Sequence, residues 1–269
     1  MPALSISGAW EDTKAIVVRE GRLLASVSLA LIVLPQSILW VIGLPVGPQA
    51  TLLSKIFYGV VILLGFAAQI ALNRLAIGPS VTVGEAVTRG FARLPALFAA
   101  LVILVVALVV LLMVVALGLG VAGVVVAPGA GEQPPPMIVL LLLVLAVLTL
   151  AVCQLFIPVA AEESAGPIRM FSRSWQLARS EYLRLLAFVI VVFLGITVAT
   201  VAGEYVVGSA LVVFVGPPGP ATVSALVLGV VVGTIQAAFT VLGAVMLARI
   251  YLQLAGRPEA EAGVPSKGI

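Results

Sequence analysis

Six apolar stretches, each long enough to cross a lipid bilayer, constrain the fold of this chain more than any other feature. They are Leu23–Leu44, Leu52–Leu72, Pro95–Val126, Met137–Ala160, Leu183–Phe214 and Thr222–Leu247. A membrane-spanning helix needs about 20 predominantly apolar residues. Because backbone polar groups in hydrocarbon must be hydrogen-bonded within the chain, these stretches are predicted to be helices. The sequence therefore predicts an all-α integral membrane protein with six transmembrane helices.

The composition supports a membrane protein and disfavours several classes of enzyme. Hydrophobic residues make up 62% of the chain and charged residues 9%, whereas soluble domains carry about 25% charged residues. The chain has no His, a single Asp and a single Cys, Cys153. It therefore lacks the residues for a disulfide framework, a His- or Cys-rich metal site, or a Ser-His hydrolase. We expect a protein that is not an enzyme and binds no metal ion, cofactor or nucleic acid.

The basic residues predict the orientation of the helices in the membrane. Thirteen of the fourteen Lys and Arg residues precede the first span, follow the last, or lie in the connections after spans two and four. Lys55 alone lies on the opposite side. Because positive residues stay in the cytoplasm, both termini are predicted to be cytoplasmic, in a bacterial inner membrane.

A similar short sequence follows each even-numbered span and suggests an internal repeat. Gly78, Gly166 and Gly256 stand 88 and then 90 residues apart, and a Pro follows each closely. A Gly followed by Pro is typical of a helix end. The pattern divides one membrane domain, residues 1–269, into repeats 1–78, 79–166 and 167–256 and a cytoplasmic tail, 257–269. Each repeat would be a cytoplasmic amphipathic interfacial helix followed by a parallel hairpin. Chance similarity in a chain of such biased composition is the alternative.

The predicted interfacial helices combine apolar and basic faces. In the third repeat, Ile168, Phe171, Trp175, Ala178 and Tyr182 share one face by helical spacing. Helices of this kind lie in the membrane interface and are attracted to anionic lipid headgroups. The residues that we expect to contact lipid are Arg89, Arg93, Arg169, Arg173, Trp175 and Arg179. The alternative is that these helices only connect the hairpins and obey the positive-inside rule.

A resemblance to known membrane proteins rests on two segments. Phe171-Ser172-Arg173-Ser174-Trp175-Gln176-Leu177-Ala178-Arg179, leading into Tyr182-Leu183-Arg184-Leu185-Leu186, resembles the Ser-Trp-x-Leu segment of YciC-like proteins. It is also similar to the membrane domain attached to some glycerophosphodiester phosphodiesterases. Trp10, Arg22-Leu23-Leu24 and Leu34-Pro35 fit the same pattern. The resemblance implies a six-span membrane domain. It does not imply phosphodiester hydrolysis, because this chain lacks the soluble catalytic domain.

Polar side chains within the spans are the remaining candidates for a site, because such residues are costly in a membrane. Gln69, Gln154 and Gln236 each lie in an even-numbered span, and Glu204 is the one carboxylate inside a long apolar run. The amides suit either hydrogen bonds between helices or a ligand site. Glu204, about 30 Å along span five, suits either the outer headgroup region or a site.

Two features indicate binding partners. One is a Gly-x-x-x-Gly pair, and the other is the set of predicted cytoplasmic helices. Gly229 and Gly233 permit close helix contact within one subunit, in a homo-oligomer or with another membrane protein. Membrane lipids, especially anionic ones, are the other expected partner. The leading hypothesis is a non-enzymatic membrane protein that binds or organises lipid-like molecules or supports envelope machinery. A small-solute or amphiphile transporter and a structural subunit of a membrane complex are the alternatives.

Overall fold

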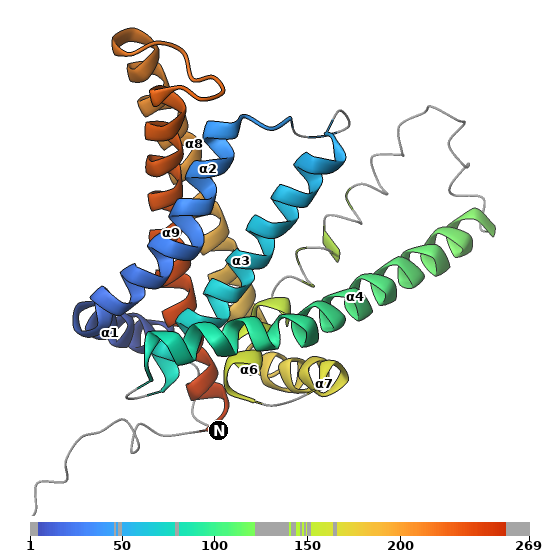
Figure 1. Ribbon diagram of the computed structural model, residues 1–269. Helices are drawn as coiled ribbons and strands as arrows, with labels where there is room; N and C mark the ends of the chain where they lie inside the picture. Colours follow the sequence, from blue (N-terminus) through green and yellow to red (C-terminus); the bar gives the residue numbers. More distant parts are fainter. Residues whose placement is uncertain are drawn as a thin grey trace, which may run out of the picture.

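The computed structural model describes residues 5–45, 47, 50–78, 81–121, 140, 144–145, 147, 149, 152–163 and 166–256. Within these residues every regular element is a helix (Figure 1). Five helices are long and apolar enough to cross a membrane: Ile6–Ile42, Leu52–Ile77, Val83–Val115, Tyr182–Phe214 and Val223–Leu254. The prediction of an all-α, multi-pass chain is therefore confirmed. Most of the predicted fourth span, Met137–Ala160, lies outside the described residues.

The first helix is one bent rod rather than a separate interfacial helix and span. It consists of α1 (Ile6–Ser28), a π-helical turn (Leu29–Val33) and α2 (Leu34–Ile42). The hydroxyl of Ser5 accepts a hydrogen bond from the backbone N–H of Gly8 at 3.1 Å and caps α1. The π-helical turn and Pro35 locate the bend, because both interrupt the regular ladder of hydrogen bonds. In Figure 1, α1 lies across one end of the bundle and α2 rises from it.

The next two helices cross closely. The hydroxyl of Thr51 accepts a hydrogen bond from Ser54 N at 3.2 Å and caps α3 (Leu52–Ile77). Then α4 (Val83–Val121) runs as one helix through Pro95, although the sequence predicted an interfacial helix followed by a span. The crossing is at Gly90, where a Cβ would lie 2.6 Å from the carbonyl oxygen of Ala67. The later turns of α4 extend away from the bundle (Figure 1).

The helices from Phe156 onward include two short helices and two long ones. A short helix, α6 (Phe156–Glu162), precedes α7 (Pro167–Ala178), which is a separate helix as the sequence predicted. Then α8 (Tyr182–Phe214) and α9 (Val223–Leu254) form a long antiparallel hairpin. The glycines within α8 do not break it, so span five is one continuous helix.

The centre of the bundle is α9, which packs against α1, α2, α3 and α8. By contrast, α2 packs far more closely on α9 than on α3, the partner that the predicted first hairpin would give it. Of the predicted hairpins whose two helices are both described, α8 and α9 pair closely, whereas α2 and α3 do not. The arrangement as three equivalent hairpins stays a prediction.

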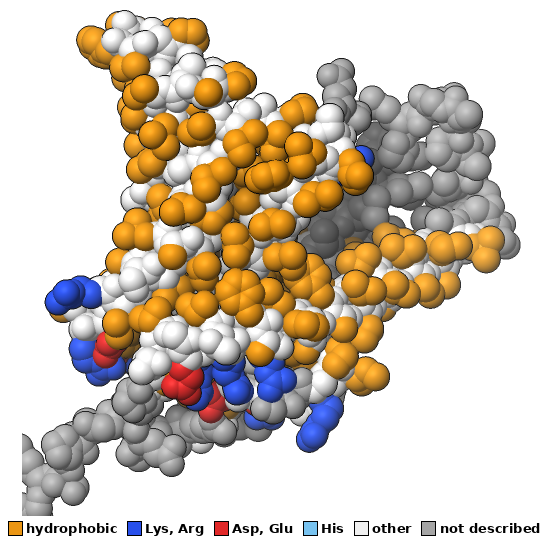
Figure 2. Space-filling model, viewed as in Figure 1, with side chains coloured by type: hydrophobic (Ala, Val, Ile, Leu, Met, Phe, Trp, Pro, Cys, Tyr) orange, Lys and Arg blue, Asp and Glu red, His pale blue; other side chains and the backbone are white. Residues whose placement is uncertain are grey.

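The two ends of the bundle differ in charge. We call the end where α3 and α9 end and where α4 and α8 begin the basic end. Figure 2 shows Lys, Arg, Asp and Glu side chains gathered there, below flanks covered by hydrophobic side chains. Arg74 lies in the last turn of α3, and the exposed Lys55 lies near its start, at the opposite, far end. This asymmetry is the one that the sequence predicted.

Candidate functional site

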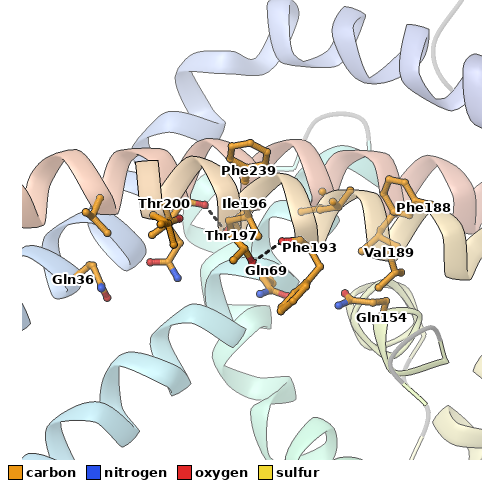
Figure 3. Close-up of a pocket in the computed structure, with 18 of the residues that line it drawn as sticks. Gln36, Gln69, Gln154, Phe188, Val189, Phe193, Ile196, Thr197, Thr200 and Phe239 are labelled. Atoms are coloured by element: carbon orange, nitrogen blue, oxygen red, sulfur yellow. Dashed lines mark hydrogen bonds between the residues drawn. The ribbon is translucent and has the colours of Figure 1, made fainter. Parts of the chain in front are cut away.

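A cavity of about 620 Å³ lies between the α8–α9 hairpin on one side and α2, α3 and the Val152–Glu162 segment on the other (Figure 3). Its volume falls within the range of sites for small molecules, roughly 300 to 1,000 Å³. The described polar residues that line it are Gln36, Gln69, Asn73, Gln154, Thr197, Thr200, Glu204, Gln236 and Thr240. The cavity thus brings together all four polar residues that the sequence singled out within the spans.

Two glycines of α8 fix how the hairpin behind the cavity is aligned. A Cβ on Gly195 would lie 3.2 Å from Cε1 of Phe239, and one on Gly203 would lie 2.5 Å from Cδ1 of Ile235. The absence of side chains at these positions lets α9 approach α8 closely. Since the helices are antiparallel, these contacts place Thr200 of α8 at about the level of Gln236 of α9.

The far end of the cavity gathers polar groups from three helices. The Cβ of Gln36 in α2 lies 3.5 Å from the position of a Cβ on Gly233 in α9. Gln36 therefore lies close to the level of Thr200, Glu204 and Gln236, which also line the cavity. Figure 3 shows Gln36 and Thr200 near one end of the cavity. Amide, hydroxyl and carboxylate groups thus share this end.

The end of the cavity nearer the basic end contains three further amides. Gln69 and Asn73 lie one turn apart on α3, and Gln154 lies at the opposite end of the cavity from Gln36 (Figure 3). Asn73 is fully buried. Its Nδ2 donates to the backbone carbonyl of Gln69 at 2.9 Å, whereas its Oδ1 has no partner within the described residues. A buried acceptor without a donor costs about 1–3 kcal/mol.

Most of the polar groups around the cavity are available to a ligand. Within the described residues, the side-chain amides of Gln36, Gln69, Gln154 and Gln236 form no hydrogen bond. Two threonines differ, because their hydroxyls donate to backbone carbonyls one turn earlier: Thr197 to Phe193 at 2.8 Å and Thr240 to Gln236 at 2.8 Å. The sequence hypothesis that the amides link neighbouring helices is thus not what the described contacts show.

The opposite wall of the cavity is apolar. It is formed largely by Phe188, Val189, Phe193 and Ile196 of α8. Phe188 and Glu204 lie sixteen residues apart, which corresponds to about 24 Å along a helix. The side chain of Phe193 lines the cavity and is 62% exposed, so the cavity opens to the surface of the bundle along α8. The α8 wall is thus apolar from Phe188 to Ile196 and polar toward Thr200 and Glu204, and an elongated cavity with apolar and polar parts suits an amphiphile.

Glu204 lies inside the apolar run of its helix. One of the two sequence interpretations placed it in the outer headgroup region, at a helix margin. The helix continues beyond it through Tyr205–Phe214, which adds ten residues, or about 15 Å. Glu204 is half-buried, and no Lys or Arg of the described residues forms an ion pair with it. Glu204 is therefore a carboxylate of the cavity wall that has no cationic partner in the described part of the chain.

Two arginines expected to contact lipid are instead occupied by protein groups. Arg89 donates from Nε to the carbonyl of Ala161 at 2.8 Å and from a terminal nitrogen to that of Glu162 at 3.0 Å. A cation at the end of α6 interacts favourably with the negative end of the helix dipole. Arg173 pairs with Glu163 at 3.2 Å. Arg74 also binds this part of the chain, through an ion pair with Glu162 at 2.5 Å.

The remaining basic residues of α7 are exposed, and its buried face differs from the predicted one. Arg169, Trp175 and Arg179 are exposed, Trp175 by 50%, and Arg93 on α4 is half-buried. The buried residues of α7 are Met170, Ser174, Leu177 and Ala178. The predicted stripe followed the aromatic residues and shares only Ala178 with the buried face. Trp175 is thus left on the surface, where interfacial aromatics are found.

The Gly-x-x-x-Gly pair packs within the chain. A Cβ on Gly229 would lie 2.8 Å from the Cβ of Trp40 and 2.9 Å from the Cα of Ser37, and one on Gly233 would lie 3.2 Å from the Cα of Val33. These two glycines therefore let α9 pack closely on the first bent helix. In the described part of the chain, no group of three or more His, Cys, Asp or Glu residues could hold a metal ion.

The family model described as "Domain of unknown function (DUF7847)" matches residues 4–254. The chain belongs to this family. The matched region contains every helix named above and all the cavity residues. No curated protein and no solved structure matches the chain.

Proposed function

We propose that this protein is a non-enzymatic membrane protein that binds a lipid-like amphiphile in the cavity beside α8. The observation that carries the proposal is the convergence of five amide side chains from four segments on one cavity with an apolar opposite wall. A polar side chain within a membrane-spanning helix is costly unless it has a partner. Because the four Gln amides and Oδ1 of Asn73 lack a partner within the described residues, a bound molecule is the natural source of their hydrogen bonds.

The arrangement of the walls indicates how such a molecule would lie. Amides both donate and accept hydrogen bonds, so they suit hydroxyl, ester and amine groups. The α8 wall, with Phe188, Val189 and Phe193, suits an acyl chain. The lateral opening beside Phe193 would allow entry from the bilayer rather than from water.

Filling the cavity tests this proposal. In a Thr200→Trp variant, the indole would occupy space at the polar end of the cavity. The matched control is Thr234→Trp, because Thr234 is exposed on α9 and does not line the cavity. Native mass spectrometry of the purified proteins should show co-purified lipid on the wild type and on Thr234→Trp, and much less on Thr200→Trp. Equal lipid on all three would contradict binding in the cavity.

Transport of a small solute or amphiphile is the second candidate. Convergent polar groups within the spans are the feature that distinguishes a transporter from a scaffold. The cavity supplies such groups from several segments, and it extends over about 24 Å of α8, a large part of the ~30 Å hydrocarbon core. Movement of fluorescent lipid between the leaflets of reconstituted vesicles, compared with protein-free vesicles, would distinguish transport from binding alone. A structural role in a membrane complex is the remaining alternative.

The surface of α7 supports a further contact with lipid. Arg169, Arg179 and Trp175 are exposed together on this helix at the basic end. Each basic group near an anionic membrane surface contributes about 1 kcal/mol to binding. We propose that this end faces the cytoplasm of a bacterial inner membrane, in a six-span chain with both termini inside. The resemblance to YciC-like proteins is part of the same proposal.

A further inference from the structure

We infer that the far end of the cavity binds a protonated primary amine, with Glu204 as its counter-charge. This inference rests on the proposed function, because it specifies the ligand of the same cavity. The four groups that form the site are Gln36, Thr200, Glu204 and Gln236, contributed by α2, α8 and α9. Glu204 and Gln236 were identified from the sequence, but their convergence with Gln36 and Thr200 was not predicted, since these residues lie up to 200 positions apart.

The negative charge of Glu204 needs a partner. A carboxylate inside an apolar helical run must be neutralised by a cation or by a proton. Of the described residues that line the cavity, none is a Lys or Arg, and Glu204 forms no ion pair in the described part of the chain. Apart from Lys55, which is exposed at the far end of the bundle and does not line the cavity, the described Lys and Arg residues gather at the basic end, where Arg74 and Arg173 pair with other carboxylates. Since the described residues offer Glu204 no cation, the ligand is the source that we infer.

The hydrogen-bonding groups at the far end of the cavity suit a primary ammonium group. A primary ammonium group carries three donors and no acceptor. The carboxylate of Glu204 and the amide oxygens of Gln36 and Gln236 supply three acceptors around the far end of the cavity, and Thr200 supplies a hydroxyl. This set matches a primary ammonium group without leaving a donor unpaired.

The residues that line the far end distinguish a primary from a quaternary ammonium group. Quaternary ammonium groups have no N–H and are held by aromatic faces. The aromatic residues of the cavity wall are Phe188, Phe193 and Phe239. Phe239 packs near Gly195, about two turns of α8 before Gly203 and Glu204. The far end is thus lined by acceptors rather than by aromatic rings, which favours a primary amine.

The unpartnered amide at the other end of the cavity points to the same kind of ligand. Oδ1 of the fully buried Asn73 has no donor within the described residues, although Asn73 lines the cavity. An amphiphile with several donors, such as an amine together with a hydroxyl, satisfies both ends. Its amine could belong to an aminophospholipid headgroup or to a soluble amine. Displacement by free ethanolamine distinguishes these two sources.

A binding experiment with defined lipids tests the inference. Purified protein is titrated with phosphatidylethanolamine, phosphatidylcholine and phosphatidylglycerol of identical acyl chains, and bound lipid is counted by native mass spectrometry. We expect the wild type to prefer phosphatidylethanolamine by about tenfold or more, the size of one charge-assisted hydrogen bond. Glu204→Gln should lose this preference. The control Glu85→Gln removes the same charge from an exposed position on α4 and should keep it.

The same titrations show whether a lipid headgroup or a soluble molecule supplies the amine. They also show whether the inference is wrong. If free ethanolamine displaces phosphatidylethanolamine from the wild type but not from Glu204→Gln, a soluble amine suffices. If it does not displace the lipid, and Glu204→Gln still lowers the affinity, the lipid headgroup supplies the amine. Equal binding of all three lipids to wild type and Glu204→Gln would overturn the amine site. The proposed function would survive that result if Thr200→Trp still removed lipid, and would fail with it if Thr200→Trp removed none.

Discussion

Replacement of Asn73 by Leu should stabilise the ligand-free protein while it weakens ligand binding. The substitution removes the buried Oδ1 that lacks a partner, which relieves about 1–3 kcal/mol. It also removes the bond from Nδ2 to the carbonyl of Gln69, which contributes about 0.5–1.5 kcal/mol. That carbonyl retains its helical backbone partner, so no new unpaired group appears. Leu has a similar length and fits an apolar helix, so the net gain should be about 1 kcal/mol.

The two effects of Asn73→Leu are measured separately. Thermal unfolding in detergent after removal of bound lipid should give a Tm about 2–4 °C above the wild type. Native mass spectrometry should show several-fold less retained lipid. The control Gln176→Leu removes an exposed amide on α7 and should leave lipid retention unchanged. A lower Tm for Asn73→Leu would refute the reasoning, since it would mean that Oδ1 is already paired in the ligand-free protein.

Three further predictions concern packing, the basic end and orientation. Gly229→Ala should lower the Tm, because overpacking against the first helix costs about 1–3 kcal/mol. Gly65→Ala, which meets no atom within 4 Å, should raise it through helix propensity; equal shifts would count against the packing. Arg89→Gln should speed amide hydrogen exchange in α6, since it removes two bonds to carbonyls, and unchanged exchange would refute that role. In a cysteine-free background, Lys55→Cys and Arg179→Cys should react with an impermeant maleimide from opposite sides of the membrane, and labelling from one side would contradict the orientation.

The helices could largely be predicted from the sequence, because a long apolar run in a membrane has few alternatives to a helix. Three of the predicted spans correspond to α3, α8 and α9. The join between an interfacial helix and its span was harder to predict. At Pro95 the structure continues one helix where the sequence suggested two, since a Pro within a helix can be accommodated by local adjustment. Only α7 is separate as predicted.

The members of the cavity could be predicted only in part. Gln69, Gln154, Glu204 and Gln236 were identified because each is polar within an apolar run. Their convergence could not be predicted, because it depends on how α9 packs against α2, α3 and α8 rather than on their order along the chain.

The residues that sequence reasoning missed had weaker signals. Gln36 follows Pro35, where a polar residue is easily read as part of a bend. Asn73 lies one residue beyond the predicted end of span two, yet it is fully buried in the cavity wall. Its spacing of four from Gln69 places both amides on one helix face, and this was the one sequence signal available. Thr197, Thr200 and Thr240 stood out little, because threonine is common in membrane helices, where its hydroxyl can donate to the preceding turn.

The distribution of charge connects the cavity to the basic end. At the basic end, Glu162 and Glu163 pair with Arg74 and Arg173, so these carboxylates are neutralised by the protein itself. Glu204 lacks such a partner within the described residues, although its helix could have carried a Lys or Arg one turn away at the same cost as Glu204 itself. A paired carboxylate at that position would close the far end to a cationic ligand. Under the proposed function, Glu204 is the one negative group of the described cavity residues that meets the ligand, and the exposed arginines of α7 meet an anionic surface. The proposal thus assigns two lipid classes to two different parts of the chain.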